Sequence, residues 1–281
     1  MVTEAPTDTT LRAVVRGAGG QAVSVTRHGE DVGVLLADGR ELTLFFVSQP
    51  EVETWRRVLA PAGIGPRLFG AGKGWVLIER IPGLDLSLAA MPLPWDLTAA
   101  WLGRVHAHFR RDAQSLRTTN PYLLEHGRSW FAAWCGRALV TLATSPDPRA
   151  RRLLRALEHY HRATRELATL PMTLVHGGLR PAVVTVDADR RRVWARDWAA
   201  AGVGPGLVDF AMLTELAQEA ERARLLRVYA RAAKTRLSSE DLDRCRLHLA
   251  LQAIGRSPAD RSSQAHDRIG EALTLAEGLA L

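Results

Sequence analysis

The sequence has 281 residues, enough for one large domain or for two lobes with a substantial core. Its hydrophobic content of 47% beside 24% charged residues is ordinary for a soluble globular protein. No apolar run approaches the ~20 residues of a membrane-spanning helix, and the first ten residues lack a secretory pattern. We therefore expect a cytoplasmic protein with no membrane partner. Cys135 and Cys245 are too few for a disulfide framework or a metal cluster.

The net charge of +7 raises the question of nucleic-acid binding. Only Lys73 and Lys234 are lysines, and the many arginines are dispersed beside acids, as in R-R-L-L-R-A-L-E. The sequence contains no interleaved basic and aromatic residues of the kind that bind single strands. The charge pattern thus argues against a nucleic-acid partner, and steeply salt-dependent binding would be its sign.

The N-terminal part of the chain has the pattern of a small sheet. A short helix is expected over residues 9–16. The β-prone runs 22–27, 32–36 and 41–47 follow, separated by the turns H-G-E-D and A-D-G-R, which predicts an antiparallel meander. A helix over 51–59 and strands over 67–70 and 75–79 complete this part.

The rest of the chain is mainly helical. Apolar residues spaced by three and four predict helices over 97–110, 129–144 and 148–168, and again from residue 207 onward. Two short β runs around the turn 187–190 interrupt this pattern. We therefore expect an α+β protein with a β-rich lobe over residues 1–82 and a helical lobe over 83–281 that carries the hairpin. Such an arrangement has a cleft between its lobes.

Several motifs follow one another in a familiar order. They are A-D-G-R-E-L-T-L-F-F, A-G-I-G-P-R-L-F-G, L-I-E-R-I-P-G, L-G-R-V-H-A, L-V-H-G-G-L-R-P-A-V-V-T-V-D-A-D, R-D-W and G-P-G-L-V-D-F-A. Their order resembles the aminoglycoside phosphotransferase and choline kinase-like family, a branch of the protein-kinase-like fold. The resemblance covers nearly the whole chain and implies a bilobal fold, with a small antiparallel β lobe and a larger α-helical lobe.

The resemblance implies cofactor-binding positions at Gly29, Phe45 and Glu79. Gly29 lies in the turn H-G-E-D, where two acidic residues would oppose a triphosphate. Phe45, or Phe46 if the register shifts by one, occupies the place of the strand lysine that clamps the phosphates. The usual acidic partner on the next helix corresponds to Glu51 or Glu53. Without that lysine, the sequence favours a solvated helix position for both.

The catalytic loop departs from the family pattern H-G-D-x-H-x-x-N. The corresponding candidate catalytic positions are His176, Gly178 and Arg180, of which Gly178 replaces the proton-accepting aspartate and Arg180 the second histidine. The metal-binding asparagine is replaced by Val183, whose side chain cannot coordinate a hard cation.

The remaining acidic positions divide into site and turn residues. Asp197, in R-D-W, matches the aspartate that holds the metal ion, and it can also brace the loop through hydrogen bonds. Asp209 matches a position that supports the catalytic loop, and His176 is favoured as a structural histidine over a catalytic base. Asp187 and Asp189 are ordinary turn residues.

These departures favour a pseudokinase, a kinase-like fold kept as a binding or scaffolding module. A peptide, a small molecule or a partner protein would occupy the cleft between the lobes, and one context is peptide or natural-product modification. The alternative is an atypical phosphotransferase acting on a small alcohol or a peptide Ser/Thr hydroxyl. ATP and magnesium are implied only by this alternative, in which Asp197 holds one metal ion and His176, Arg180 or a partner's residue replaces the lost groups.

Overall fold

A computed structural model of the chain describes residues 15–16, 22–28, 31–90, 92–256 and 267–280. The chain forms two compact units. The first combines Met1–Trp101, Gln114–Leu124 and His176–Ala201, and the second combines Leu102–Ala113, Glu125–Val175 and Gly202–Leu281. In space, the hairpin after residue 176 therefore groups with the N-terminal sheet. The predicted division at residue 82 separates the chain by sequence and stays a prediction.

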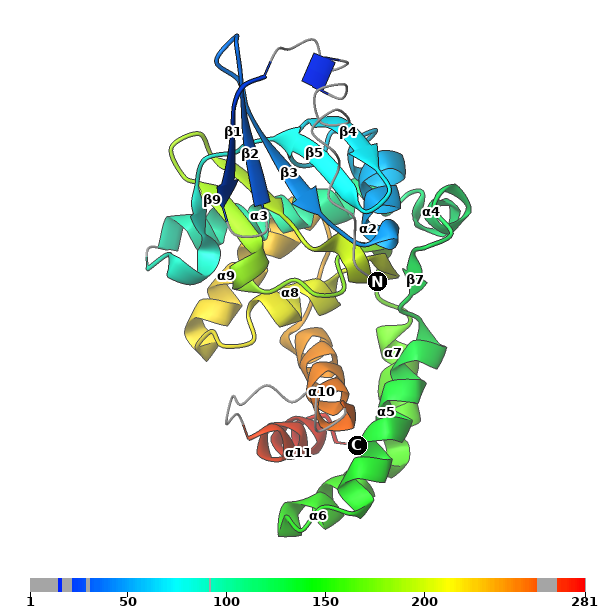
Figure 1. Cartoon of the computed structure of the whole chain (residues 1–281). Coiled ribbons are helices and arrows are strands. Elements are labelled where there is room, and N and C mark those ends of the chain that lie inside the picture. Colours follow the sequence, from blue (N-terminus) through cyan, green and yellow to red (C-terminus); the bar gives the residue numbers. More distant parts are fainter. Residues whose placement is uncertain (1–14, 17–21, 29–30, 91, 257–266, 281) are drawn as a thin grey trace. The chain divides into compact units, whose positions relative to one another are not determined.

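The first unit is built on a five-stranded antiparallel sheet, as the turn chemistry predicts (Figure 1). Its spatial order is β1-β2-β3-β5-β4. The strands are β1 (Ala22–His28), β2 (Asp31–Leu36), β3 (Glu41–Phe46), β4 (Leu68–Gly72) and β5 (Trp75–Glu79).

Side chains of β3 alternate between the two faces of this sheet. Leu42 and Leu44 are buried in a core cluster that includes Val34 of β2 and Leu77 of β5. Because successive residues of a strand point to opposite faces, Thr43 and Phe45 lie on the face away from this cluster.

One helix follows β3 in the first unit. Helix α2 (Gln49–Thr54) begins after Ser48 with a proline in its first turn, and the chain continues as a π-helical turn over Trp55–Leu59. The Ala60 N–H donates to the Trp55 carbonyl at 3.0 Å, the i→i−5 bond that defines such a turn. Val52 and Trp55 are buried on this segment, so the predicted helix over 51–59 is confirmed with a wider final turn.

A second, three-stranded sheet of the first unit has the order β10-β9-β6. Its strands are β6 (Leu84–Asp85), β9 (Val184–Asp187) and β10 (Arg192–Ala195). Asp187 accepts a hydrogen bond from the Arg190 N–H at 3.1 Å, which is the turn role that its position predicts.

Helix α3 (Pro92–Phe109) carries the chain from the first unit into the second, and α4 (Ala113–Thr119) and β7 (Leu124–Glu125) lie at later crossings. Within the second unit, β8 (Met172–Val175) pairs antiparallel with β11 (Gly202–Pro205). Its remaining helices are α5 (Arg128–Ala143), α6 (Pro148–Ala156), α7 (Tyr160–Leu167), α8 (Leu207–Leu213), α9 (Glu219–Ala233), α10 (Ser239–Gly255) and α11 (Arg268–Gly278).

The helices of the second unit bury a common apolar core. Phe131 is fully buried, and the cluster around Leu153 and Leu251 joins α5, α6, α10 and α11. The predicted helix over 148–168 starts at the capping side chain of Asp147 and is divided into α6 and α7 by a 3₁₀ turn over Leu157–His159.

Both cysteines are buried free thiols. None of the helices in the described part of the chain combines the length and the apolar character needed to cross a membrane.

Two helical glycines of the second unit give opposite predictions. A Cβ at Gly103 of α3 would lie 2.6 Å from the Tyr229 carbonyl oxygen, whereas a Cβ at Gly136 of α5 would meet no atom within 4 Å. We expect Gly103→Ala to lower the free energy of unfolding by about 1–3 kcal/mol through overpacking. Gly136→Ala should raise it by about 0.5–1 kcal/mol. Chemical denaturation measures both, and equal effects of the two substitutions would contradict this packing of α3.

Candidate functional site

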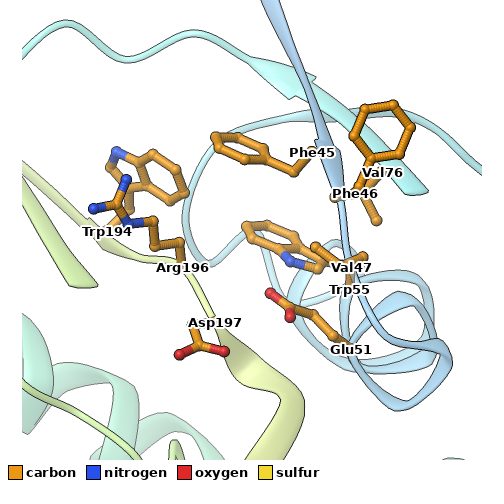
Figure 2. A pocket seen from close by; sticks show the side chains of 9 residues that line it. All are labelled: Phe45, Phe46, Val47, Glu51, Trp55, Val76, Trp194, Arg196 and Asp197. Carbon is orange, nitrogen blue, oxygen red and sulfur yellow. The ribbon is translucent and has the colours of Figure 1, made fainter. Parts of the chain in front are cut away.

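Two neighbouring cavities lie in the first unit, and the larger of the two has a volume of about 430 Å³ and lies between β3, α2 and the segment after β10 (Figure 2). Its walls are mainly aromatic and apolar, with carboxyl groups on the side opposite Phe45. The lining residues are Phe45, Phe46, Val47, Glu51, Trp55, Val76, Trp194, Arg196 and Asp197.

A second cavity of about 280 Å³ lies beside the first. Phe45 and Trp194 line both cavities, and their ring centroids are 6.0 Å apart. This aromatic pair therefore forms a wall that the two cavities share. The other lining residues of the smaller cavity are Gly33, Thr43, Glu79, Arg80, Ile81, Pro82, Gly83, Asp85 and Thr185.

The register of β3 decides which residue stands where the resemblance places a lysine. Phe45 is paired with Val76 and shares its face with Thr43, the other β3 residue of the smaller cavity. Phe46 ends the strand, lines only the larger cavity, and also packs against the core cluster of the opposite face. The cavity-facing position is thus Phe45, an aromatic ring without charge.

Glu51 is a buried carboxyl group in the larger cavity, with 4% of its surface exposed. It accepts hydrogen bonds from the backbone N–H groups of Trp198 and Asp197 and from the Trp55 side chain. Burial outweighs these bonds and, together with the nearby Asp197 charge, raises the pKa of Glu51 to about 7.

The expectation that Glu51 and Glu53 are solvated helix residues is wrong for both. Glu53 is 5% exposed, and its carboxylate accepts hydrogen bonds from Gln49, Arg56 and Arg57. The physical reason is that four consecutive residues of α2, from Glu51 to Thr54, are all buried. Glu51 and Glu53 therefore both lose contact with water. Of the two, Glu51 faces the cavity and Glu53 is paired with arginines.

Arg196 is the one cation among the residues lining the larger cavity, all of which the structure describes. Its guanidinium donates to the Ala182 carbonyl at 2.9 Å and lies 3.6 Å from a carboxylate oxygen of Asp85. Figure 2 shows the guanidinium beside Trp194, away from the Glu51 carboxyl. The positive charge of Arg196 is therefore engaged outside the Glu51 corner of the cavity.

Glu79, the third predicted cofactor position, is bound to Arg192. The two side chains form a two-bond ion pair with N–O distances of 2.9 and 3.0 Å. Hydrogen bonding to Arg192 lowers the pKa of Glu79 below its ordinary value. The carboxylate thus joins the end of β5 to the start of β10. Gly29, the first predicted cofactor position, lies outside the described residues.

His176 is held by hydrogen bonds at both ring nitrogens. Nε2 lies 2.8 Å from the Arg196 carbonyl oxygen, and Nδ1 accepts from the Gly178 N–H at 3.2 Å. The ring is 1% exposed and packs on Trp198 at a centroid distance of 4.6 Å. These contacts describe a side chain that fixes the loop, because neither nitrogen can take a substrate proton without breaking a bond.

The rest of the loop offers little to a phosphoryl acceptor. Gly177 adopts φ +75°, and a Cβ there would come 2.2 Å from the Ala200 carbonyl oxygen, so the tight turn requires glycine. Gly178 supplies only a backbone N–H, and Arg180 is exposed. Neither Gly178 nor Arg180, both among the described residues, lines either cavity.

The donor set does not fit a magnesium nucleotide. Asp197 is exposed, has the left-handed backbone conformation at φ 67°, and shares the cavity with Glu51. Val183 contributes no side-chain oxygen, and its carbonyl accepts the Arg196 N–H at 3.0 Å. Within the described residues, no group of three or more His, Cys, Asp or Glu side chains could hold a metal ion. Two carboxyl groups facing aromatic rings are a poor phosphate-metal site.

Asp209 of α8 belongs to a buried network of the second unit. It is 0% exposed, and Nε2 of His106 lies 3.4 Å from its carboxylate. The other nitrogen of His106 lies 2.8 Å from the Tyr229 hydroxyl. This arrangement gives Asp209 a structural contact inside its own unit.

Sequence reasoning missed Trp55 and Trp194 as site residues. Both line the larger cavity, and Trp194 also separates it from the smaller one. The signal was present in the hairpin, since Trp194 and Arg196 stand two residues apart and such residues point to the same face of a strand. Trp55 faces the cavity through the π-helical turn, which no sequence pattern announces.

We predict that Glu51→Gln stabilises the protein at pH 8 and changes its stability much less at pH 5. Because the pKa of Glu51 is about 7 in the folded chain against 4.5 normally, its ionisation opposes folding increasingly as pH rises between these values. At about 1.4 kcal/mol per pKa unit, the gain above pH 7 is roughly 1–3 kcal/mol.

Urea unfolding at both pH values measures this difference. The control is Glu41→Gln. Glu41 is an exposed residue of β3, and its carboxylate pairs with Arg80. A loss of stability at pH 8 on Glu51→Gln, or a gain that is equal at both pH values, would contradict the assignment of an uncompensated buried charge.

Comparison with known proteins was made by sequence and by structure. No curated protein sequence matches the chain. Among solved structures, a macrolide 2'-phosphotransferase, MphH from Brachybacterium faecium, superposes with a TM-score of 0.64 at 20% identity, covering 98% of each chain. Choline kinase LicA from Streptococcus pneumoniae superposes with a TM-score of 0.56 at 15% identity, covering 92% of this chain and 94% of that one.

A third similar structure is an aminoglycoside phosphotransferase from Alicyclobacillus acidocaldarius, with a TM-score of 0.56 at 14% identity, covering 99% of this chain and 96% of the other. At these identities the structures establish the fold, which is protein-kinase-like and α+β as expected. Residues 43–248 match the sequence model described as the phosphotransferase enzyme family. The chain belongs to the phosphotransferase enzyme family, which includes the aminoglycoside phosphotransferases.

Proposed function

We propose that this member of the phosphotransferase family is a pseudokinase, a binding module that has kept the fold without phosphoryl transfer. The observation that carries the proposal is that Phe45 and Glu51 line the same cavity, and that among the described residues no cation is bound to the Glu51 carboxyl group. Phosphoryl transfer in kinases needs a strand lysine paired with a helix glutamate, so that the phosphates are held in position. Here the acid is retained and buried, while the strand offers an aromatic ring.

Electrostatics add to this argument. A nucleotide carries several negative charges, and the larger cavity presents Glu51 and Asp197 beside a single arginine that is engaged by Asp85. Like charges in a cavity of low dielectric repel more strongly than in water. The carboxylates of the cavity would therefore repel a triphosphate.

The loop geometry supports the same proposal. Phosphoryl transfer also needs a group that accepts the hydroxyl proton and side-chain oxygens that bind the metal. Gly178 and Val183 supply neither, and His176 is tied to Arg196 and Gly178 through both nitrogens. General-base removal alone typically costs 10²–10⁴-fold in rate.

One observation favours an alternative, an atypical ATP-dependent phosphotransferase acting on a small alcohol or a peptide Ser/Thr hydroxyl. Asp197 and Glu51 line one cavity, so two of the acids that such an enzyme uses are retained in a shared site. In that function Asp197 would hold one magnesium ion, and a partner's residue would supply the missing base.

The ligand of the pseudokinase belongs to the classes expected from the sequence, namely a peptide, a small molecule or a partner protein. Peptide or natural-product modification in the cytoplasm is the setting that we propose for it. The two cavities together offer a volume ordinary for small-molecule sites of about 300–1,000 Å³.

Calorimetric titration with ATP, in the presence and absence of magnesium, tests the proposal. We expect no saturable binding at millimolar nucleotide, and no turnover of ATP by the isolated chain. Asp197→Ala serves as the control variant, because it removes the metal-binding candidate at an exposed position. Magnesium-dependent binding that is lost in Asp197→Ala would favour the alternative, and turnover of ATP with it would overturn the pseudokinase.

A further inference from the structure

We propose that the larger cavity of the first unit binds an alkylammonium group, held by the Glu51 and Asp197 carboxylates and enclosed by the Phe45, Trp55 and Trp194 rings. This inference rests on the proposed function, because a cavity that holds magnesium-ATP has no room for it. It assigns the site a ligand of opposite charge to a nucleotide.

The aromatic walls are the first observation behind it. Phe45, Trp55 and Trp194 come from three different elements, β3, the π-helical turn and β10, and surround one space (Figure 2). Aromatic rings attract cations through the negative charge of their faces, and tryptophan attracts them most strongly. Two of the three rings here are tryptophans.

The carboxyl groups are the second observation. Figure 2 shows Glu51 and Asp197 on the side of the cavity away from Phe45. Glu51 is 4% exposed, and its recorded contacts are N–H donors rather than a cation. A buried carboxylate is stabilised by an opposite charge at short range. An ammonium group would supply that charge, which β3 does not supply because Phe45 is neutral.

The absence of a competing cation is the third observation. Arg196 is the one basic residue in the lining, and its guanidinium is bound to Asp85 and to the Ala182 carbonyl. The arginines nearest Glu51 in sequence, Arg56 and Arg57, pair with Glu53. Within the described residues, the charge of the cavity is therefore open to a ligand.

Trp194 carries a buried donor at the wall that the two cavities share, and Figure 2 shows its Nε1 on the side of the indole away from Phe45. The side chain is 6% exposed, and its Nε1 has no hydrogen-bond partner among the described residues. Buried indole N–H groups normally donate to an acceptor.

A divalent metal ion fits this cavity less well than an organic cation does. Magnesium requires near-octahedral oxygen ligands and binds its water tightly, whereas the side-chain oxygens of this lining come from two carboxyl groups and the rest of the wall is largely aromatic. An alkylammonium group instead gains from both kinds of wall, with its charge on the acids and its methylene groups on the rings. The choice between these cations can be measured.

The test is calorimetric titration of the unmodified full chain with hexylammonium chloride, 1-hexanol and magnesium chloride at about pH 8.5, where an alkylamine is still protonated. We expect saturable hexylammonium binding and at least tenfold weaker binding of the neutral hexanol. A further arm uses a peptide that is blocked at both termini and contains a single lysine with a free ε-amino group. This arm tells a free alkylamine from a lysine side chain as the source of the ammonium.

Matched variants locate the binding. Glu51→Gln should weaken hexylammonium binding at least tenfold, and Trp55→Leu at least threefold. Glu41→Gln and Phe69→Leu are the controls, because they change an exposed acid and a half-buried ring of the same unit that line neither cavity. Both controls should bind hexylammonium as the unmodified chain does.

The outcomes separate this inference from the proposed function. Equal binding of hexylammonium and hexanol, no binding of either amine probe, or binding unaffected by Glu51→Gln would overturn the alkylammonium site. In each case the pseudokinase would stand if magnesium-ATP also fails to bind. Magnesium-ATP binding displaced by hexylammonium would overturn the pseudokinase itself.

Discussion

Among the described residues, a buried carboxyl group without a cationic partner in its cavity governs the chemistry of the first unit. Glu51 is 4% exposed and is stabilised by backbone N–H groups at 197 and 198 and by the Trp55 side chain. These neutral donors offset only part of the cost of burying charge, which leaves its pKa at about 7. The cavity is therefore negative, or readily made so, where a nucleotide site must be positive. A poor fit to the negative phosphates of a nucleotide follows from this charge.

The stability of the first unit and the chemistry of its cavity depend on different side chains. In β3, Leu42 and Leu44 belong to the core, while Phe45 on the other face lines both cavities. In the loop after β8, His176 keeps its bonds to Arg196 and Gly178, although Gly178 carries no carboxylate. Glu79 is engaged by Arg192 and holds two sheets of the unit together. The contacts that hold the backbone of this unit are thus largely separate from the side chains that line its cavities.

The strands of the first sheet and most helices could be predicted from the sequence, because turns such as A-D-G-R and the alternation of β3 report local geometry. The identity of the cavity-facing residue was open between Phe45 and Phe46, since only pairing with Val76 fixes the register. The burial of Glu51 and Glu53 was not predicted, because it depends on how α2 packs against segments more than a hundred residues away. The same holds for the grouping of the hairpin with the sheet.

The charge state of Glu51 in the folded chain can be observed directly. A ¹³C NMR titration of the glutamate carboxyl carbons, with Glu51 assigned through its absence in Glu51→Gln, measures the pKa of that group in the folded chain. The account predicts a midpoint of about 7. A midpoint at or below the ordinary value of 4.5 would show that a cation compensates Glu51 in the folded protein, and would contradict the account.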